Sequence, residues 1–218
     1  MNGYLSIRNL TVRLKGGGTI LRDVSLNVAA GQVHGLMGES GAGKSMIGKA
    51  VLGTLPRALD ITSGQIWLDG VDLQTLPPAE RRNRIGALAA LIPQDPLTAL
   101  NPSRRIGPQI TRRLVDILGW KRQDAAKRAL ELLNEVHIPD APRVMRSYPH
   151  ELSGGMRQRI LIASAFAAEP KLIIADEPTT ALDVTVQKQI LHLISEMQAR
   201  HDTALLFVTH DLGVMSKV

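Results

Sequence analysis

Apolar and polar residues alternate over the first thirty positions, in two runs that a glycine-rich turn at 15–18 separates. The apolar positions are Leu5, Ile7, Leu10, Val24, Leu26 and Val28. A period of two is typical of β-strands that bury one face. Residues 65–68 and 71–73, joined at Asp69-Gly70, predict either a hairpin or a strand that leaves a tight turn. The N-terminal part of the chain is therefore expected to be an antiparallel β unit.

Further along, short apolar segments alternate with segments of helical periodicity. The predicted strands are Gln32–Met37, Leu88–Ile92, Lys171–Ala175 and Ala204–Val208. The predicted helices are Lys44–Leu52, a stretch that begins after Ser153-Gly154-Gly155 and runs through Phe166, and Val184–Arg200. Strands that alternate with helices predict an α/β fold with a parallel sheet. From Pro102 to Val136 the pattern is helical and charged, so we expect a helical insert at about residues 95–165 within a single domain of residues 1–218.

The composition is that of an ordinary globular protein: 44% of the 218 residues are apolar and 21% are charged. No apolar run approaches the roughly 18 residues that a membrane-spanning helix needs. The N-terminus lacks the basic-then-apolar order of a signal peptide. The absence of cysteine excludes disulfide scaffolds, cysteine zinc sites, iron–sulfur clusters and cysteine nucleophiles. We therefore expect a cytoplasmic location.

The net charge of +6 is concentrated in one segment. Residues 101–128 hold eight basic and two acidic side chains and therefore the whole surplus. The basic residues, which we call the basic stripe, are Arg104, Arg105, Arg112, Arg113, Lys121, Arg122, Lys127 and Arg128. Such a stripe could face nucleic acid, anionic lipid or an acidic partner, or it could be a solvated helical face.

One motif with specific chemistry fits the P-loop pattern and lies between a predicted strand and a predicted helix. Its residues are Gly38, Glu39, Ser40, Gly41, Ala42, Gly43, Lys44 and Ser45. Glycines let successive backbone N–H groups surround phosphate oxygens, and the helix N-terminus adds partial positive charge. We expect Lys44 to reach the β- and γ-phosphates of a nucleotide and the Ser45 hydroxyl to bind Mg²⁺.

A second part of a nucleotide site follows the apolar strand near residue 172. This strand ends in Asp176 and Glu177, and Asp176 stands 132 residues after Lys44. An acid at the end of a buried strand is held rigidly, so Asp176 can bind Mg²⁺ through water. Glu177 is placed to orient or deprotonate an attacking water.

A second glycine-rich loop, Leu152–Arg159 (LSGGMRQR), opens a predicted helix. Ser153, Gly154 and Gly155 could present hydrogen-bond donors to an anion, and Ser153 could equally be a simple helix cap. The loop follows the P-loop and Gln94, and it precedes Asp176-Glu177, Ala181-Leu182-Asp183 and His210. In this order and spacing, over roughly residues 4 to 215, the sequence resembles the ATP-binding subunit of an ABC transporter.

The resemblance implies a P-loop NTPase sheet core with an N-terminal antiparallel β subdomain and a helical subdomain, and it implies ATP and Mg²⁺ as cofactors. It also implies that Gln94 contacts Mg²⁺ and the attacking water, that Glu177 is the catalytic base and that His210 contacts the γ-phosphate. The Ser153–Gly155 loop is then expected to cover ATP held by a second ATPase subunit, with Asp183 at the seam of the dimer.

Three segments, Gln94–Pro102, Ser147–Glu151 and Ile174–Thr185, resemble those of oligopeptide, dipeptide and nickel import ATPases. This resemblance implies ATP hydrolysis that energises import of peptides or nickel through a membrane permease, with an external substrate-binding protein as an indirect partner. The subunit is then peripheral on the inner face of the cell membrane. We expect the basic stripe to seat it on the membrane and permease, and not on nucleic acid, since Trp120 is the only aromatic residue within the stripe.

The sequence departs from the family in two respects. No aromatic residue stands near Leu14 and Lys15, where family members stack one on adenine, so we expect weaker or less base-selective nucleotide binding. The chain ends eight residues after His210, whereas family members continue, so we expect C-terminal elements to be missing. The alternatives are a non-transport ABC ATPase and a truncated remnant with little activity.

Overall fold

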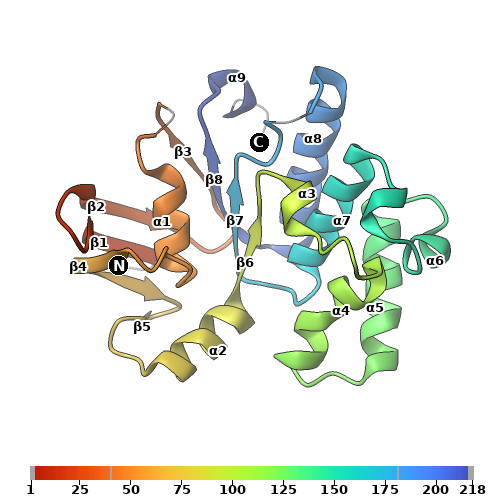
Figure 1. Ribbon diagram of the computed structural model, residues 1–218, viewed down its shortest axis with the longest axis horizontal. Helices are drawn as coiled ribbons and strands as arrows, with labels where there is room; N and C mark the ends of the chain where they lie inside the picture. Colours follow the sequence, from red (N-terminus) through yellow and green to blue (C-terminus); the bar gives the residue numbers. More distant parts are fainter. Residues whose placement is uncertain (1–2, 40, 181, 216–218) are drawn as a thin grey trace.

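The computed structural model describes residues 3–39, 41–180 and 182–215, and this part of the chain forms two four-stranded sheets (Figure 1). The antiparallel sheet has the strand order β2-β1-β4-β5, and the parallel sheet has the order β3-β8-β7-β6. The strands are β1 (Leu5–Leu14), β2 (Thr19–Val28), β3 (Val33–Met37), β4 (Leu59–Leu68), β5 (Val71–Asp72), β6 (Ala89–Ile92), β7 (Leu172–Asp176) and β8 (Ala204–Thr209). An antiparallel sheet together with a parallel α/β sheet is the expected fold class, although β3 of the parallel sheet precedes β4 and β5 in the chain.

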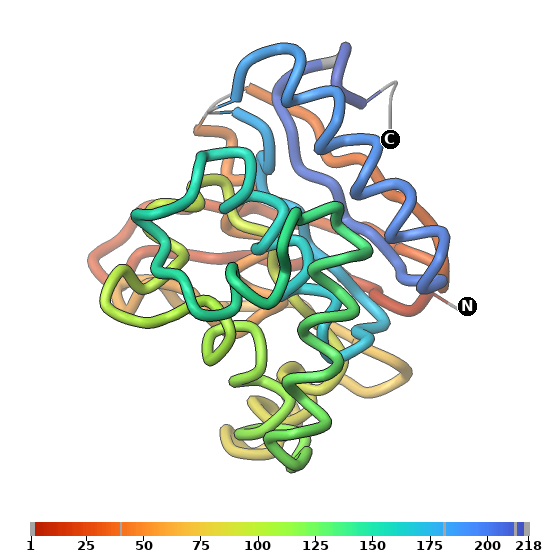
Figure 2. Tube along the Cα trace, turned by 90° about the vertical axis from the view of Figure 1, so that its right-hand side faces the viewer, coloured from red at the N-terminus to blue at the C-terminus, as the bar shows by residue number. Residues whose placement is uncertain are grey.

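Helices α3 to α7 gather on one side of the parallel sheet, and the antiparallel sheet lies on the other (Figure 1). In the view of Figure 2, the green segment that contains the turn between α4 and α5 forms the lower end of the molecule. The helices are α1 (Lys44–Val51), α2 (Pro78–Leu88), α3 (Pro96–Ala99), α4 (Ile106–Asp116), α5 (Arg122–Glu135), α6 (Ala141–Val144), the 3₁₀ helix η1 (Pro149–Glu151), α7 (Gly154–Phe166), α8 (Val184–His201) and α9 (Leu212–Met215). None of the described helices is both long and apolar enough to cross a lipid bilayer.

The antiparallel sheet forms as the alternation of the N-terminal residues predicts. Leu5 and Ile7 of β1 lie opposite Leu68 and Ile66 of β4, and all four side chains are buried. The pairing continues to the far end of β1, so β4 is longer than the predicted strand over 65–68. One face of this sheet packs with α1 and the parallel sheet in a shared hydrophobic core.

Strands β7 and β8 form the centre of the parallel sheet, with a hydrophobic core on each face. Ile173 and Phe207 belong to the core that α4, α5, α7 and α8 complete. Ile174 and Leu206 belong to the core shared with the antiparallel sheet and α1. A strand covered on both faces needs apolar residues at every position, which explains the continuous apolar runs of β7 and β8.

The predicted strand Leu88–Ile92 differs from its prediction in position and burial. It is β6, which begins at Ala89 and forms an edge of the parallel sheet. Its apolar run is typical of a buried strand, but Leu91 is 41% exposed, whereas Ala89, Ala90 and Ile92 are buried. Helix α2, which the sequence analysis did not predict, runs directly into β6. Its only buried residue is Ile85, so the helix shows no apolar stripe in the sequence.

The charged segment predicted as helical forms α4 and α5. Ile106, Ile110 and Leu114 recur at every fourth position of α4, and all three are buried. This face of α4 packs on α5 and α7, and α7 in turn contacts α8. The helices of the insert therefore rest on the parallel sheet through one continuous hydrophobic core.

Candidate nucleotide-binding site

The P-loop connects the end of β3 to the start of α1. Gly43, the residue before α1, has φ 86°, a left-handed conformation that glycine adopts without strain. A Cβ atom at Gly43 would lie 2.8 Å from Leu21 Cδ2 and 3.2 Å from the backbone oxygen of Ile20, so a larger residue would push against β2. Ser40 and Ala181, each part of a motif in the sequence, lie outside the described residues.

The ammonium group of Lys44 is enclosed by the P-loop itself. Lys44 is 7% exposed, and its Nζ donates hydrogen bonds of 2.8 Å to the backbone oxygens of Gly38 and Glu39. A cation at the N-terminus of a helix, surrounded by a glycine-rich loop, is suited to bind phosphate oxygens. The residues present therefore fit the nucleotide phosphates that the sequence predicts.

A hydroxyl and a carboxylate meet at the boundary between the P-loop and β7. Ser45 Oγ donates to Asp176 Oδ1 at 2.8 Å, although 131 positions separate the two residues. Asp176 is the last residue of β7, a central strand of the parallel sheet, so it lies at the sheet edge where the strands end. Hydroxyl and carboxylate oxygens are the ligands that Mg²⁺ prefers, so this pair fits a Mg²⁺ site.

Glu177 has a strained backbone, and its carboxylate has several partners. Its φ is 46°, and its N–H donates to the backbone oxygen of Val208 at 2.9 Å. Glu177 Oε2 lies 3.1 Å from His210 Nδ1, accepts from Thr180 Oγ1 at 3.0 Å and is 3.5 Å from Gln94 Nε2. The structure therefore brings together Gln94, Glu177 and His210. Thr180, which donates to Glu177, was not among the predicted site residues. It could have been found from its position three residues after Glu177, in the same turn.

A cavity of about 530 Å³ lies against the P-loop. Its polar lining residues include Lys44, Ser45, Gln94 and Glu177. Its apolar lining residues include Leu14, Ile20, Pro56, Ala58 and Leu59. Sequence reasoning noted only that an aromatic residue is absent near Leu14. In its place aliphatic side chains offer apolar surface without ring stacking.

The residues of the second glycine-rich loop lie apart from this cavity. Ser153 accepts a hydrogen bond from Met156 N at 3.3 Å and so caps α7, and Asp183 caps α8 through two backbone N–H groups at 3.0 Å. A Cβ atom added at Gly154 would have nothing within 4 Å among the described residues. Among the described residues predicted for the site, those that line the cavity are Gly41, Gly43, Lys44, Ser45, Gln94 and Glu177. Those that do not line it are Gly38, Glu39, Ala42, Ser153, Gly154, Gly155, Asp176, Asp183 and His210.

The basic stripe does not form one charged face. Arg113 Nε donates to the backbone oxygen of Gly86 at 2.7 Å, and burial lowers the pKa of its guanidinium. Arg128 is 14% exposed and forms ion pairs with three glutamates, whereas Arg112 is exposed and pairs with Asp116. Arg112 and Arg113 therefore do not share one face of α4, because neighbouring residues on a helix point about 100° apart.

Comparison with known proteins relates the chain to transport ATP-binding subunits. Residues 21–180 match the family model described as ABC transporter. The dipeptide transport ATP-binding protein DppD of Lactococcus lactis subsp. cremoris is 44% identical over 216 residues, which cover 97% of this chain and 62% of that protein. The probable D,D-dipeptide transport ATP-binding protein DdpD of Escherichia coli K12 is 48% identical over 199 residues, covering 91% and 61%. The chain spans about three fifths of the length of the curated relatives it matches.

Solved structures of similar fold are nucleotide-binding cassettes. The dimeric structure of MJ0796, described as a bacterial ABC transporter cassette, is 26% identical, has a TM-score of 0.83, and the match covers 98% of this chain and 90% of that one. The same cassette in a post-hydrolysis state bound to ADP and Pi is 27% identical with a TM-score of 0.82, and the match covers 96% and 89%.

Proposed function

The chain belongs to the ABC transporter family, and from this premise we propose that it hydrolyses ATP with Mg²⁺ to energise the import of short peptides through a membrane permease. The observation that carries the proposal is the meeting of the P-loop with the end of β7, where Ser45 Oγ lies 2.8 Å from Asp176 Oδ1 and Glu177 follows in the chain. A phosphate-binding loop, oxygen ligands for Mg²⁺ and a general base around one cavity are the parts that nucleotide hydrolysis needs.

In the proposed reaction, Lys44 and the P-loop N–H groups hold the β- and γ-phosphates. Ser45, Asp176 and Gln94 would hold Mg²⁺, which offsets the negative charge of the phosphates when bound. Glu177 takes a proton from water, the water oxygen bonds to the γ-phosphorus, and the bond from that phosphorus to the β–γ bridging oxygen breaks. The leaving oxygen stays on ADP, and His210 contacts the γ-phosphate.

We propose that a second ATPase subunit, identical or related, completes the site. Ser153, Gly154 and Gly155 would cover ATP held by the partner subunit, and Asp183 would lie at the seam. The open space beside Gly154 at the start of α7, within the described chain, supports a role between chains. The permease would hold this pair on the cytoplasmic face of the cell membrane, with an external binding protein as an indirect partner.

The choice of short peptides as cargo rests on the relatives. The similar proteins are described as dipeptide and D,D-dipeptide transport ATP-binding proteins. An oligopeptide transport ATP-binding protein, OppD of Bacillus subtilis, is 44% identical over 218 residues, covering 98% of this chain and 61% of that protein. These names favour peptides over nickel among the cargoes that the sequence suggests.

The test of the proposed function is Mg²⁺-dependent phosphate release from ATP by the purified chain and its Lys44→Ala variant. We expect loss of nucleotide binding and hydrolysis in the variant, because Lys44 is the enclosed cation of the P-loop and charge stabilisation supplies most of phosphoryl-transfer catalysis. Lys49→Ala removes the same charge from the other end of α1 and is the matched control. Unchanged turnover in Lys44→Ala would refute the P-loop assignment.

A further inference from the structure

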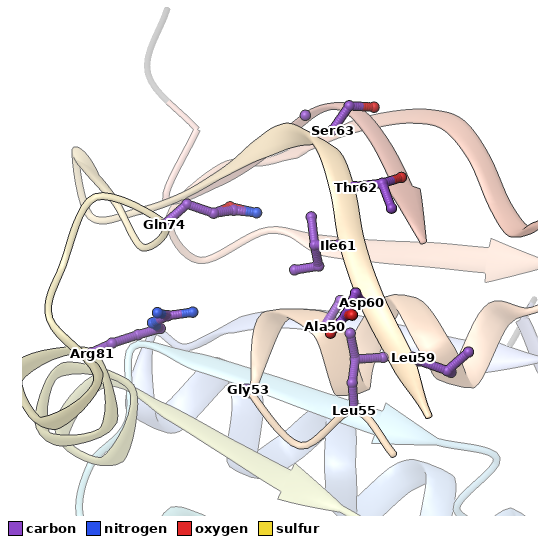
Figure 3. A pocket seen from close by; sticks show the side chains of 11 residues that line it. Ala50, Gly53, Leu55, Leu59, Asp60, Ile61, Thr62, Ser63, Gln74 and Arg81 are labelled. Atoms are coloured by element: carbon purple, nitrogen blue, oxygen red, sulfur yellow. The ribbon is translucent and has the colours of Figure 1, made fainter. Parts of the chain in front are cut away.

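A second cavity, of about 630 Å³, lies between the end of α1, strand β4 and the segment leading into α2 (Figure 3). Its volume is in the range of small-molecule sites, which is about 300–1,000 Å³. Of its described lining residues, only Leu59 also borders the nucleotide cavity. None of the predicted site residues lines it, so the nucleotide chemistry does not account for it.

Two polar side chains point into this space without partners. Figure 3 shows Gln74 and Arg81 directed toward the region beside Ile61. The amide nitrogen and oxygen of Gln74 and the Nε of Arg81 are shielded from solvent and have no hydrogen-bond partner in the described part of the chain. Buried polar atoms are nearly always hydrogen-bonded, so three unpaired atoms at one cavity indicate a group that binds there.

The polar side chains that neighbour Gln74 and Arg81 have hydrogen-bond or ion-pair partners within the fold, unlike the unpaired atoms of these two residues. Arg84, one turn further along α2, donates to the backbone oxygens of Leu68 and Asp69. Asp72 accepts from the side chain of Gln65 and from the backbone N–H of Gln74, which leaves the Gln74 amide free. Asp60 also lines the cavity, and its largely exposed carboxylate pairs with Lys15 at 3.7 Å. None of the ion pairs among the described residues involves Arg81.

The chemistry of the lining defines what would fit. The guanidinium of Arg81 is a cationic hydrogen-bond donor, so it favours an anionic acceptor. The two oxygens of a carboxylate match the planar geometry of its N–H groups. Gln74 needs an acceptor for its NH₂ group and a donor for its carbonyl oxygen. Leu55, Leu59 and Ile61 add aliphatic wall on the side of α1 and β4.

We propose that this cavity binds the α-carboxylate, adjacent N–H and aliphatic side chain of an amino acid or of the C-terminal residue of a short peptide. The ligand carboxylate pairs with the guanidinium of Arg81, and the ligand N–H donates to the side-chain oxygen of Gln74. The aliphatic side chain of the ligand contacts Leu59 and Ile61. The site is independent of ATP hydrolysis, although its ligand touches Leu59, which also borders the nucleotide cavity.

The test is calorimetric titration of the 218-residue chain with N-acetyl-leucine and, as matched probe, its amide, in which a neutral NH₂ group replaces one carboxylate oxygen. We expect saturable binding of N-acetyl-leucine and binding of the amide weaker by about tenfold or more, the scale of a lost charge-assisted pair. Saturating ATP leaves the binding of N-acetyl-leucine in place, because the two ligands occupy different cavities. Free leucine serves as a third probe: tighter binding than N-acetyl-leucine assigns the site to amino acids, and weaker binding assigns it to peptide C-termini.

Variants locate the site. Arg81→Gln abolishes the preference for N-acetyl-leucine over its amide. Gln74→Met weakens the binding of both compounds. Arg82→Gln, the neighbouring exposed arginine of α2, keeps the preference of the unmodified chain. The unmodified chain alone already tests the proposal: absence of saturable binding, equal binding of acid and amide, or displacement by ATP would each overturn it. An unchanged preference in Arg81→Gln would do the same.

Discussion

Glu177 combines an unfavourable backbone conformation with a constrained carboxylate. A φ of 46° is left-handed, which costs about 1–2 kcal/mol for a residue other than glycine. The bond from its N–H to Val208 and the contacts of Oε2 with His210 and Thr180 hold the residue in place. Such strain persists where the surrounding structure enforces it, and it concentrates at functional sites. This geometry supports the role proposed for Glu177.

Glu177→Gln is expected to retain ATP binding and to slow hydrolysis by about 10²-fold or more, the range for loss of a general base. The amide preserves the shape of the side chain but cannot accept the proton of the attacking water. Phosphate release under saturating ATP and equilibrium binding of ATP measure the two effects. Glu80→Gln, on the exposed surface of α2, is the control. A variant with unchanged phosphate release would show that Glu177 is not the base.

Tyr4 is a residue whose ionisation is linked to folding. Its hydroxyl is buried without a hydrogen-bond partner among the described residues, and burial, with a smaller contribution from Asp69, raises its pKa to about 12 despite the opposing charge of Arg84. The unfolded chain ionises first, from the ordinary value of 10.0, so the stability associated with Tyr4 is present below that pH and is lost as pH rises toward about 12.

Tyr4→Phe is therefore expected to reduce the fall in unfolding free energy above the ordinary tyrosine pKa, without destabilising the protein at neutral pH. The phenyl ring keeps the packing and removes a hydroxyl that has no partner. Urea denaturation of both proteins, below and above that pKa, measures the difference. An identical alkaline loss of stability in the two proteins would contradict the linkage.

At the scale of elements, α4 presents two different sides. Arg113 faces inward and bonds to the carbonyl of Gly86, whereas Arg112 is exposed. Arg112 and Arg122 line a surface cavity of about 730 Å³ with Arg104 and Arg146, and Asp116 is the acid among its lining residues. The arginines that gather around this cavity are therefore only part of the basic stripe. They also include Arg146, which does not belong to the stripe.

Charge reversal of Arg112 and Arg122 to Glu is expected to reduce co-sedimentation of the chain with vesicles that contain the permease and anionic phospholipid. Each basic residue near an anionic surface contributes about 1 kcal/mol, so two reversals act strongly at low salt. Reversal of Arg82 and Lys188, exposed residues on α2 and α8, is the matched control. Salt-sensitive binding to nucleic acid that the α4 reversals remove would contradict the membrane role.

At the scale of the whole molecule, the nucleotide cavity is built where the two sheets approach each other. Leu14 and Ile20 come from strands β1 and β2 of the antiparallel sheet, while Ser45 and Glu177 follow the parallel strands β3 and β7. The loop at Gly154 lies away from this cavity and has open space around it within the described chain. A complete site in the proposed dimer thus takes one part from each subunit.

Glu177→Gln with Mg²⁺ and ATP is expected to elute as a dimer in size-exclusion chromatography, because slow hydrolysis preserves the ATP that would bridge the subunits. Adding Gly154→Asp is expected to restore the monomer without lowering the melting temperature. An aspartate in the first turn of a helix is compatible with the helix dipole, and a Cβ at Gly154 would meet no described atom within 4 Å apart from its own local backbone and chain neighbours. A dimer that persists in the double variant would contradict the proposed role of the loop.

The sequence alone was sufficient for features that arise from local pattern. The buried runs of β7 and β8, the P-loop before α1 and the cap of α7 at Ser153 all lie within a few residues of their predicted positions. Each depends on backbone geometry and burial that a short segment imposes by itself. Helix α2 escaped prediction because it buries only Ile85 and so shows no amphipathic period.

The tertiary structure alone decided which distant groups meet and which way each side chain points. The 2.8 Å contact of Ser45 with Asp176 spans 131 positions and depends on where β7 enters the sheet. The inward turn of Arg113 and the unpaired amide of Gln74 depend on neighbours from other elements. A periodic pattern specifies the face of an element that is buried, but the partner of a polar group depends on how the elements pack in three dimensions.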